Sequence, residues 1–173
     1  MQPEDVRTIA VGPTVNQIPA VERGLVDVML SQAITISVLK RRHPDLQILI
    51  DTRTQELTKD ALGVEEVPVS VLAVNEGWLR SNSDTARRLG ASLQEALAWI
   101  RNHTAEQIRE ALPVSCRSPD VAADLDAIVS EKSMLSKDGR MTSALHEAAV
   151  RVSGIVNQPS LAHAYANELL DAK

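Results

Sequence analysis

The sequence predicts an α/β fold for the first part of the chain and an all-helical fold for the remainder. Before residue 75, four short runs rich in Val, Ile and Leu alternate with polar or helical segments. After residue 75, every periodic segment has the spacing of an amphipathic helix. Apolar residues make up 44% of the 173 residues, but there is no Phe, so we expect a core of Leu, Ile, Val and Ala. The predicted division is a small α/β lobe over 1–75 and a helical part over 76–173.

The first predicted strand, 8–11, stops at Gly12 and is followed by a predicted helix over 16–25. Pro19 is compatible with this helix because it would lie near the first turn, where its missing N–H is harmless. Residues 26–30 form the second predicted strand. A strand, a helix and a strand in so short a stretch predict a parallel pair with a right-handed crossover.

The next elements continue this pattern. Residues 33–39 predict a short helix and 46–50 a third strand, so the sheet is short and mostly parallel. Residues 51–66 are polar and are either a loop or a loop with a short helix. The fourth predicted strand, 69–74, is apolar on both faces, as expected of a buried strand.

The helical part carries clear start signals. Asn82 or Ser83 would cap a long helix, and Thr104 with Gln107 would form a capping box. Four further signals are a Ser118-Pro119 start, a turn at 137–139, a Thr142 cap and a Ser160 cap on the last helix.

Charge and composition exclude several functions. The net charge is −5 and the only basic clusters, 40–42 and 87–88, are short, so we expect no nucleic-acid partner. No start of the signal-peptide type and no long apolar run are present, which predicts a chain that stays where it is made. The single cysteine, Cys116, lacks a local histidine, and the four histidines are isolated. We therefore expect no catalytic residue, no metal and no cofactor.

Two stretches are candidates for ligand binding. Both follow a predicted strand and precede a helix, where free N–H groups and the helix dipole favour an oxyanion. In an open parallel sheet the two would lie side by side. Each polar residue could equally be an ordinary helix cap. The predicted contacts are Gly12, Thr14, Asn16, Ser31, Gln32 and Thr35.

The order of elements resembles the carboxyl-terminal half of ABC-transporter substrate-binding proteins of the nitrate/sulfonate/taurine and thiamine-precursor type. The sequence letters that carry this resemblance are spread over nearly the whole chain, each as a loose pattern. They lie at 20–28 (AVERGLVDV), 77–79 (GWL), 82–84 (NSD), 96–100 (ALAWI), 134–141 (MLSKDGRM) and 164–169 (AYANEL). Ser83 stands where the family usually has proline.

The resemblance implies a periplasmic-binding-protein-like (type II) lobe that is incomplete, because full-length members begin with an export signal and a first lobe. It implies a solute-binding component of an ABC-type uptake system that holds a small, anionic molecule in a cleft between lobes. Its partners would be an ABC permease, if the chain is exported, and a separately encoded first lobe or a second copy. The family is periplasmic or membrane-anchored outside the cytoplasm, whereas this chain shows no export signal.

Two other interpretations stay open at this point. The chain could be a cytosolic ligand-sensing or interaction domain with the same fold and no catalysis. It could also be an enzyme, since a thiamine-pyrimidine synthase has a related fold. That synthase would be expected to carry a cysteine-rich motif, and this chain has only Cys116.

Overall fold

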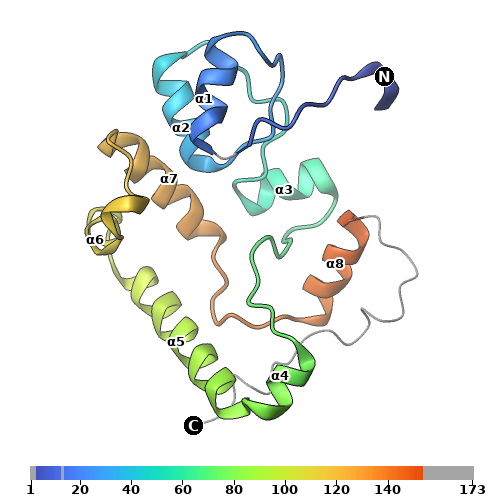
Figure 1. Ribbon diagram of the computed structural model, residues 1–173, viewed down its shortest axis with the longest axis vertical. Helices are drawn as coiled ribbons and strands as arrows, with labels where there is room; N and C mark the ends of the chain where they lie inside the picture. The colour runs from blue at the N-terminus through green and yellow to red at the C-terminus, as the bar shows by residue number, and fades with distance from the viewer. Residues whose placement is uncertain (1–2, 13, 154–173) are drawn as a thin grey trace.

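The computed structural model describes residues 3–12 and 14–153, and this part of the chain is helical (Figure 1). Its helices are α1 (Thr14–Glu22), α2 (Ala33–Arg42), α3 (Gln55–Leu62), α4 (Glu76–Ser81), α5 (Ser83–Asn102), α6 (Ala105–Ala111), α7 (Val121–Met134) and α8 (Ser143–Ser153). Two short 3-10 helices, Pro3–Asp5 and Val114–Cys116, complete the regular structure of the described residues.

The predicted sheet is wrong. The segments 8–11, 26–30, 46–50 and 69–74 contain no strand or bridge residue in the described structure. An α/β lobe of the periplasmic-binding-protein type is therefore not what this chain forms, and the resemblance to ABC-transporter substrate-binding proteins is not supported. The physical reason is that β-propensity and alternation report how well a segment fits a pleated, half-buried surface. They do not supply the neighbouring strand whose backbone must complete the ladder.

The two helices nearest the start of the chain end where the sequence allows it. α1 closes at Gly24, whose φ of 65° is in the left-handed region that glycine adopts readily. The Leu25 N–H donates to the Ala20 carbonyl at 2.9 Å and completes this end. α2 ends in the basic residues 40–42, which suits the negative end of the helix dipole. The Lys40 ammonium also donates to the carbonyls of Pro44 and Leu46 and fastens the loop that follows.

The core lies where α7 packs against α2 and α6, with α1 on the other side of α2 (Figure 1). It contains small or medium side chains only, which agrees with the predicted Leu, Ile, Val and Ala core. The buried apolar side chains of the described residues are Ala20, Ala33, Val38, Leu39, Ile108, Ala123 and Ala127 in these four helices, and Ala86, Leu97 and Ala148 in α5 and α8. The first part of the chain therefore packs on the second, and the proposed division at residue 75 stays a prediction.

α5 is the longest helix, and its predicted apolar side receives the turn at 137–139. A Cβ on Gly139 would lie 3.5 Å from Leu97 Cδ1. The Gln94 side-chain amide donates to the Asp138 carbonyl at 3.1 Å, and Arg101 donates to the Lys137 carbonyl. The Lys132 ammonium of α7 donates to the His103 carbonyl just after α5. The long helix is thus held from one side by polar contacts as well as by leucines.

Several start signals are confirmed and others are corrected. Thr104 and Gln107 form the predicted capping box of α6, and the Thr142 hydroxyl accepts the Leu145 N–H. The helix α7 is capped by Asp120, whose carboxylate accepts the Ala123 N–H, and Ser118 supports it by accepting the Asp120 N–H. Two short helices, α3 within the polar segment and α4, complete the described set. The helix predicted after Ser160 lies outside the described residues.

Candidate functional site

The two stretches predicted to bind a ligand lie close together, although no sheet brings them there. The Ser31 hydroxyl, two residues before α2, donates to Oε1 of Gln17 in α1 at 2.8 Å. Gly12 has a φ of 82°, and a Cβ on it would lie 3.4 Å from Nδ2 of Asn16. The proximity comes from the packing of α1 on α2, not from adjacent strand ends.

The other predicted contacts have different surroundings. Thr14 is the first residue of α1. Gln32 precedes α2 as its N-cap, is exposed and makes no side-chain capping bond. Thr35 is fully buried, with 0% of its surface exposed, and its hydroxyl has no hydrogen-bond partner among the described residues. A role for these residues in ligand binding stays a prediction.

Gln17 is the residue that sequence reasoning missed in this region. It lies in the second turn of α1 and holds Ser31, so it links the two stretches. Glutamines are common on helix surfaces, and the sequence contains no signal that would distinguish this one from a solvated side chain. Only the packing of α1 against the segment before α2 identifies it.

The opposite ends of α1 and α2 carry a small charged cluster. The Glu22 carboxylate accepts from the Arg42 guanidinium at 3.0 Å and lies 3.4 Å from Nε2 of His43. The hydrogen bond from Arg42 lowers the pKa of Glu22 below its usual value, and His43 adds to the effect. Glu22 and His43 border a shallow, open depression with Val21, Asp45 and Leu46. An exposed ion pair of this kind contributes little to stability and gives no sign of chemistry.

A second polar cluster is structural. The Arg109 guanidinium of α6 donates to the Asp124 carboxylate of α7 at 2.8 Å and to the Ser118 carbonyl at 3.0 Å. The same carboxylate accepts the Ser118 N–H. Asp124 is nearly buried, with 7% of its side chain exposed. Its oxygens are satisfied by the guanidinium and the backbone, so this cluster holds α6 to α7 and is closed to a ligand.

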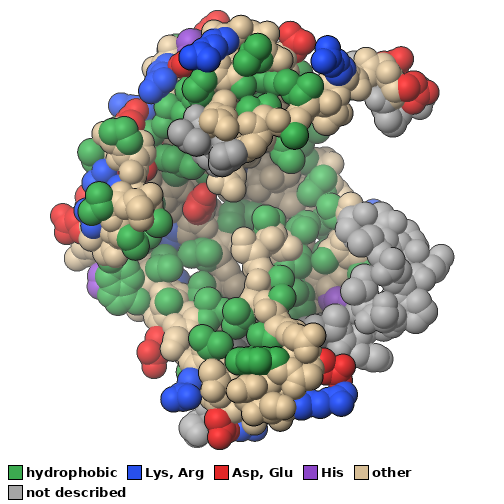
Figure 2. All heavy atoms as spheres, in the orientation of Figure 1, with side chains coloured by type: hydrophobic (Ala, Val, Ile, Leu, Met, Phe, Trp, Pro, Cys, Tyr) green, Lys and Arg blue, Asp and Glu red, His purple; other side chains and the backbone are tan. Residues whose placement is uncertain are grey.

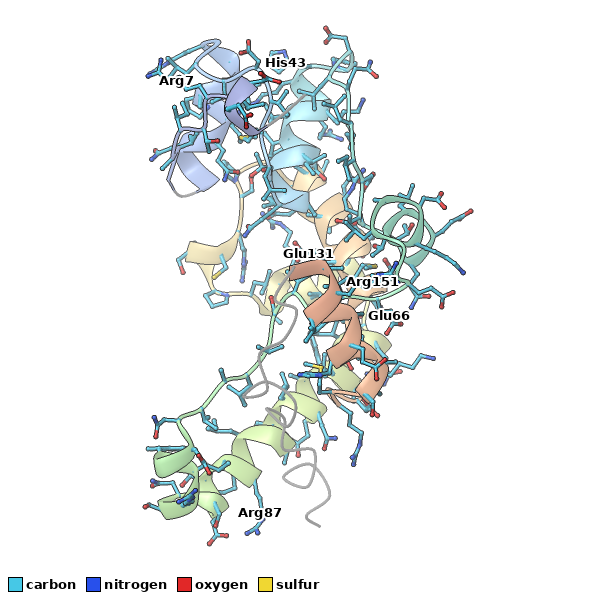
Figure 3. The ribbon with its side chains drawn as sticks, turned by 90° about the vertical axis from the view of Figure 1, so that its right-hand side faces the viewer. Arg7, His43, Glu66, Arg87, Glu131 and Arg151 are labelled. Carbon is cyan, nitrogen blue, oxygen red and sulfur yellow. The ribbon has the colours of Figure 1, made fainter. Side chains whose placement is uncertain are left out.

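A third acidic residue lies in the middle of the molecule. Figure 3 shows Glu131 there with Arg151 and Glu66, between the end that carries His43 and the end that carries Arg87. Partial burial raises the pKa of the Glu131 carboxyl above its usual value. Because water still reaches the side chain, the effect on stability is small.

The most unusual surface is an apolar segment without regular structure, residues 67–75, which runs between α3 and α4 and bends at Ser70 (Figure 1). Its side chains include Val69, Val71, Leu72 and Val74, and Val69 is 89% exposed. Within the described part of the chain, no hydrogen bond joins the backbone of 67–74 to another residue. This backbone and its apolar side chains have the composition of a buried strand and none of its contacts.

Further apolar side chains are exposed beyond this segment. Five of them lie in the other segments that the sequence predicted as strands, and the rest lie in helices and loops; the five are Ile9, Val28, Leu30, Leu49 and Ile50. Leu30 is 95% exposed. Figure 2 shows hydrophobic side chains gathered around the hollowed front of the molecule.

The described residues offer no metal site and no span. No three His, Cys, Asp or Glu side chains among them gather so that they could hold a metal ion. None of the described helices has the length and apolarity that crossing a bilayer requires. Cys116 is an exposed free thiol. His103 stacks on Trp99 with ring centroids 3.9 Å apart, and His163 lies outside the described residues.

Comparison with known proteins gives one informative likeness. The chain is similar to a solved structure of a protein from Bordetella bronchiseptica RB50, with a TM-score of 0.80 and 25% sequence identity. The match covers 96% of this chain and 54% of the Bordetella chain, so this chain spans about half the length of the protein it matches. No protein-family model matches the sequence, and no curated protein does.

Proposed function

We propose that this chain is a non-catalytic interaction module that completes its fold with a second polypeptide. The observation that carries the proposal is the run of exposed apolar side chains at 69–74, on a backbone that makes no hydrogen bond within the described part of the chain. Soluble monomers rarely expose contiguous apolar patches of more than a few hundred Å². Surface of this kind marks a place where another molecule binds.

The distribution of the exposed side chains supports a polypeptide partner. The exposed apolar side chains of 69–74 lie on a backbone that makes no hydrogen bond within the described part of the chain. A small molecule would cover only part of such a surface and could not satisfy a row of backbone groups. A second polypeptide can do both, because it offers apolar area and a matching row of donors and acceptors.

The likeness to the Bordetella structure is consistent with this role. The match uses 54% of that chain, so a comparable length of polypeptide there has no counterpart in this one. We infer that an arrangement with this backbone has room for additional polypeptide.

The test uses the purified chain at several concentrations. Calorimetry measures its melting temperature, light scattering its association state, and the fluorescence of an apolar dye its exposed apolar surface. We expect either strong dye binding with a broad melt, or a melting temperature that rises with chain concentration because association stabilises the fold. Contradiction would come from a monomer that melts cooperatively at a concentration-independent temperature and binds no dye.

A second candidate is the binding of a small oxyanion at the first turns of α1 and α2. The hydrogen bond between Ser31 and Gln17 favours it, because it places the predicted contacts side by side. Gln32 leaves the start of α2 without a side-chain cap, and an anion would suit such a helix start.

A sulfate titration followed by calorimetry tests this second candidate. Binding by the unaltered chain should be weakened by Ser31→Ala, since the hydroxyl and its link to α1 are lost. Ser115→Ala, in an exposed 3-10 helix elsewhere, is the matched control and should leave binding unchanged. Equal binding by all three proteins would point to a general salt effect and contradict the candidate.

A further inference from the structure

We propose that residues 67–74 pair with the same segment of a second copy of this chain and form an antiparallel β-ribbon across a two-fold axis. The inference rests on the proposed function and names its partner. The observations behind it are the exposed side chains of 69–74, a backbone over 67–74 that makes no hydrogen bond within the described part of the chain, and the strand-like apolar sequence VPVSVLAV. The backbone bends at Ser70, and pairing would straighten it.

The segment is well suited to pairing with itself. It contains no charged side chain, so two copies can lie against each other without like charges directly opposite. Valine is among the residues most favoured in strands, and four of the eight positions are valine. In a closed two-fold dimer the same surface serves both partners, which is the commonest arrangement of soluble oligomers.

The exposed apolar side chains of the segment suit a partner of protein size. Val69, Val71, Leu72 and Val74 are exposed over 89%, 60%, 59% and 42% of their surfaces. Obligate dimers bury about 2,000–5,000 Å² or more in total. Because a two-stranded ribbon alone is marginal in water, other apolar side chains of each copy would be buried with it.

Pro68 determines which edge of the segment pairs. In a strand, the N–H groups of alternate residues point to opposite edges, so Pro68 interrupts the edge shared by the even-numbered residues. The other edge keeps the N–H groups of Val67, Val69, Val71 and Ala73. A two-fold axis normal to the ribbon brings this same edge of both copies together.

A matched pair of proline variants tests the edge. Val71→Pro removes a donor from the intact edge and should weaken the dimer by about tenfold or more in dissociation constant. Leu72→Pro removes an N–H donor from the edge that Pro68 already interrupts. It should change the dissociation constant of the dimer by about threefold or less. Circular dichroism should show the same helix content for both, because both positions lie outside the helices. Equal weakening by the two variants would mean apolar docking without strand pairing and would overturn the proposal.

Single cysteines test the two-fold axis. In a Cys116→Ser background, cysteine is placed in turn at Val69, Ser70, Val71 and Leu72, with Val114→Cys as the exposed control outside the segment. Directly opposite Cα atoms in an antiparallel pair are about 4.5–5.5 Å apart, within disulfide reach. If the cysteine is moved by one residue from that position, the two cysteines of the dimer are offset by two residues. This offset is about 6.8 Å along the strand, beyond disulfide reach.

We therefore expect one position in the segment to form a disulfide-linked dimer rapidly, and the control to form it slowly. The proposal that the partner is a second copy would be overturned if light scattering shows a monomer and no cysteine position in the segment cross-links faster than the control. The dye and melting measurements of the unaltered chain then decide the proposed function separately. Slow amide hydrogen exchange at 67–74 in a monomer would show that the chain covers this segment itself, and would overturn both proposals.

Discussion

At the scale of single residues, the Arg109–Asp124 pair is the interaction most sensitive to substitution. Both groups are largely withdrawn from water, with 18% and 7% of their side chains exposed. Asp124→Ala would leave the Arg109 guanidinium without its carboxylate in a poorly solvated place. We expect the free energy of unfolding, measured by urea titration, to fall by about 3 kcal/mol.

The control for this pair is an exposed one in α5, where Arg87 donates to Asp84 at 2.8 Å. Asp84→Ala should lower the free energy of unfolding by about 0.5 kcal/mol or less, because water and salt screen the interaction. Equal losses for the two substitutions would show that Asp124 is not buried as the structure places it.

Glu131 gives a prediction about pH. Burial raises the pKa of its carboxyl, so the folded chain favours the protonated, neutral form. Its contribution to stability is fully present below the ordinary value of 4.5 and is lost as the pH rises through the raised pKa. Glu131→Gln should therefore stabilise the chain slightly at neutral pH, with the difference vanishing below pH 4.5 in urea titrations at several pH values. A difference that grows on acidification would contradict this assignment.

At the scale of elements, the capping box of α6 gives a direct test. The Thr104 hydroxyl accepts the Gln107 N–H, and the Gln107 side chain accepts the Thr104 N–H at 2.9 Å. Thr104→Ala should lower the free energy of unfolding by about 1 kcal/mol. Thr104→Ser should keep most of the stability that the cap contributes, because the hydroxyl remains. If the alanine and serine variants are equally stable, the cap does not contribute as the structure indicates.

The secondary-structure elements show which predictions from the sequence were correct. The capping box, the Thr142 cap and the long helix ending near residue 102 are confirmed, because they depend on contacts within a few residues. The segments 26–30, 46–50 and 69–74 were wrong as strands, because pairing depends on residues far away in the chain. The sequence did not predict α4, because its six residues are too few to show a helical period.

At the scale of the whole molecule, the structure predicts where a substitution costs stability and where it does not. Leu39 is 2% exposed in the packing of α2, so Leu39→Ala should cost about 3 kcal/mol. Val69→Lys, at a side chain that is 89% exposed, should change the free energy of unfolding by about 0.5 kcal/mol or less. The lysine variant should also bind less apolar dye than the unaltered chain. A large loss of stability for Val69→Lys in a monomer would contradict the exposed placement of 67–75.

The candidate site was also predicted only in part from the sequence. The polar residues at the starts of α1 and α2 were found from sequence, since they precede helices whose periodicity is plain. Their proximity through Gln17 and Ser31 depends on how the two helices pack. The exposed apolar surface was missed, because an apolar run in a sequence is ordinarily assigned to the interior.

The sequence by itself determined the amphipathic helices of the described second part other than α4, the capping box of α6, the Thr142 cap, and a core free of phenylalanine. These follow from interactions between near neighbours and from composition, which no change of partner alters. Only the tertiary structure decided that the apolar runs of the first part stay unpaired and exposed, and that α7 forms the centre of the core. The physical reason is that a strand exists only with its neighbour, and the described chain supplies none to these segments.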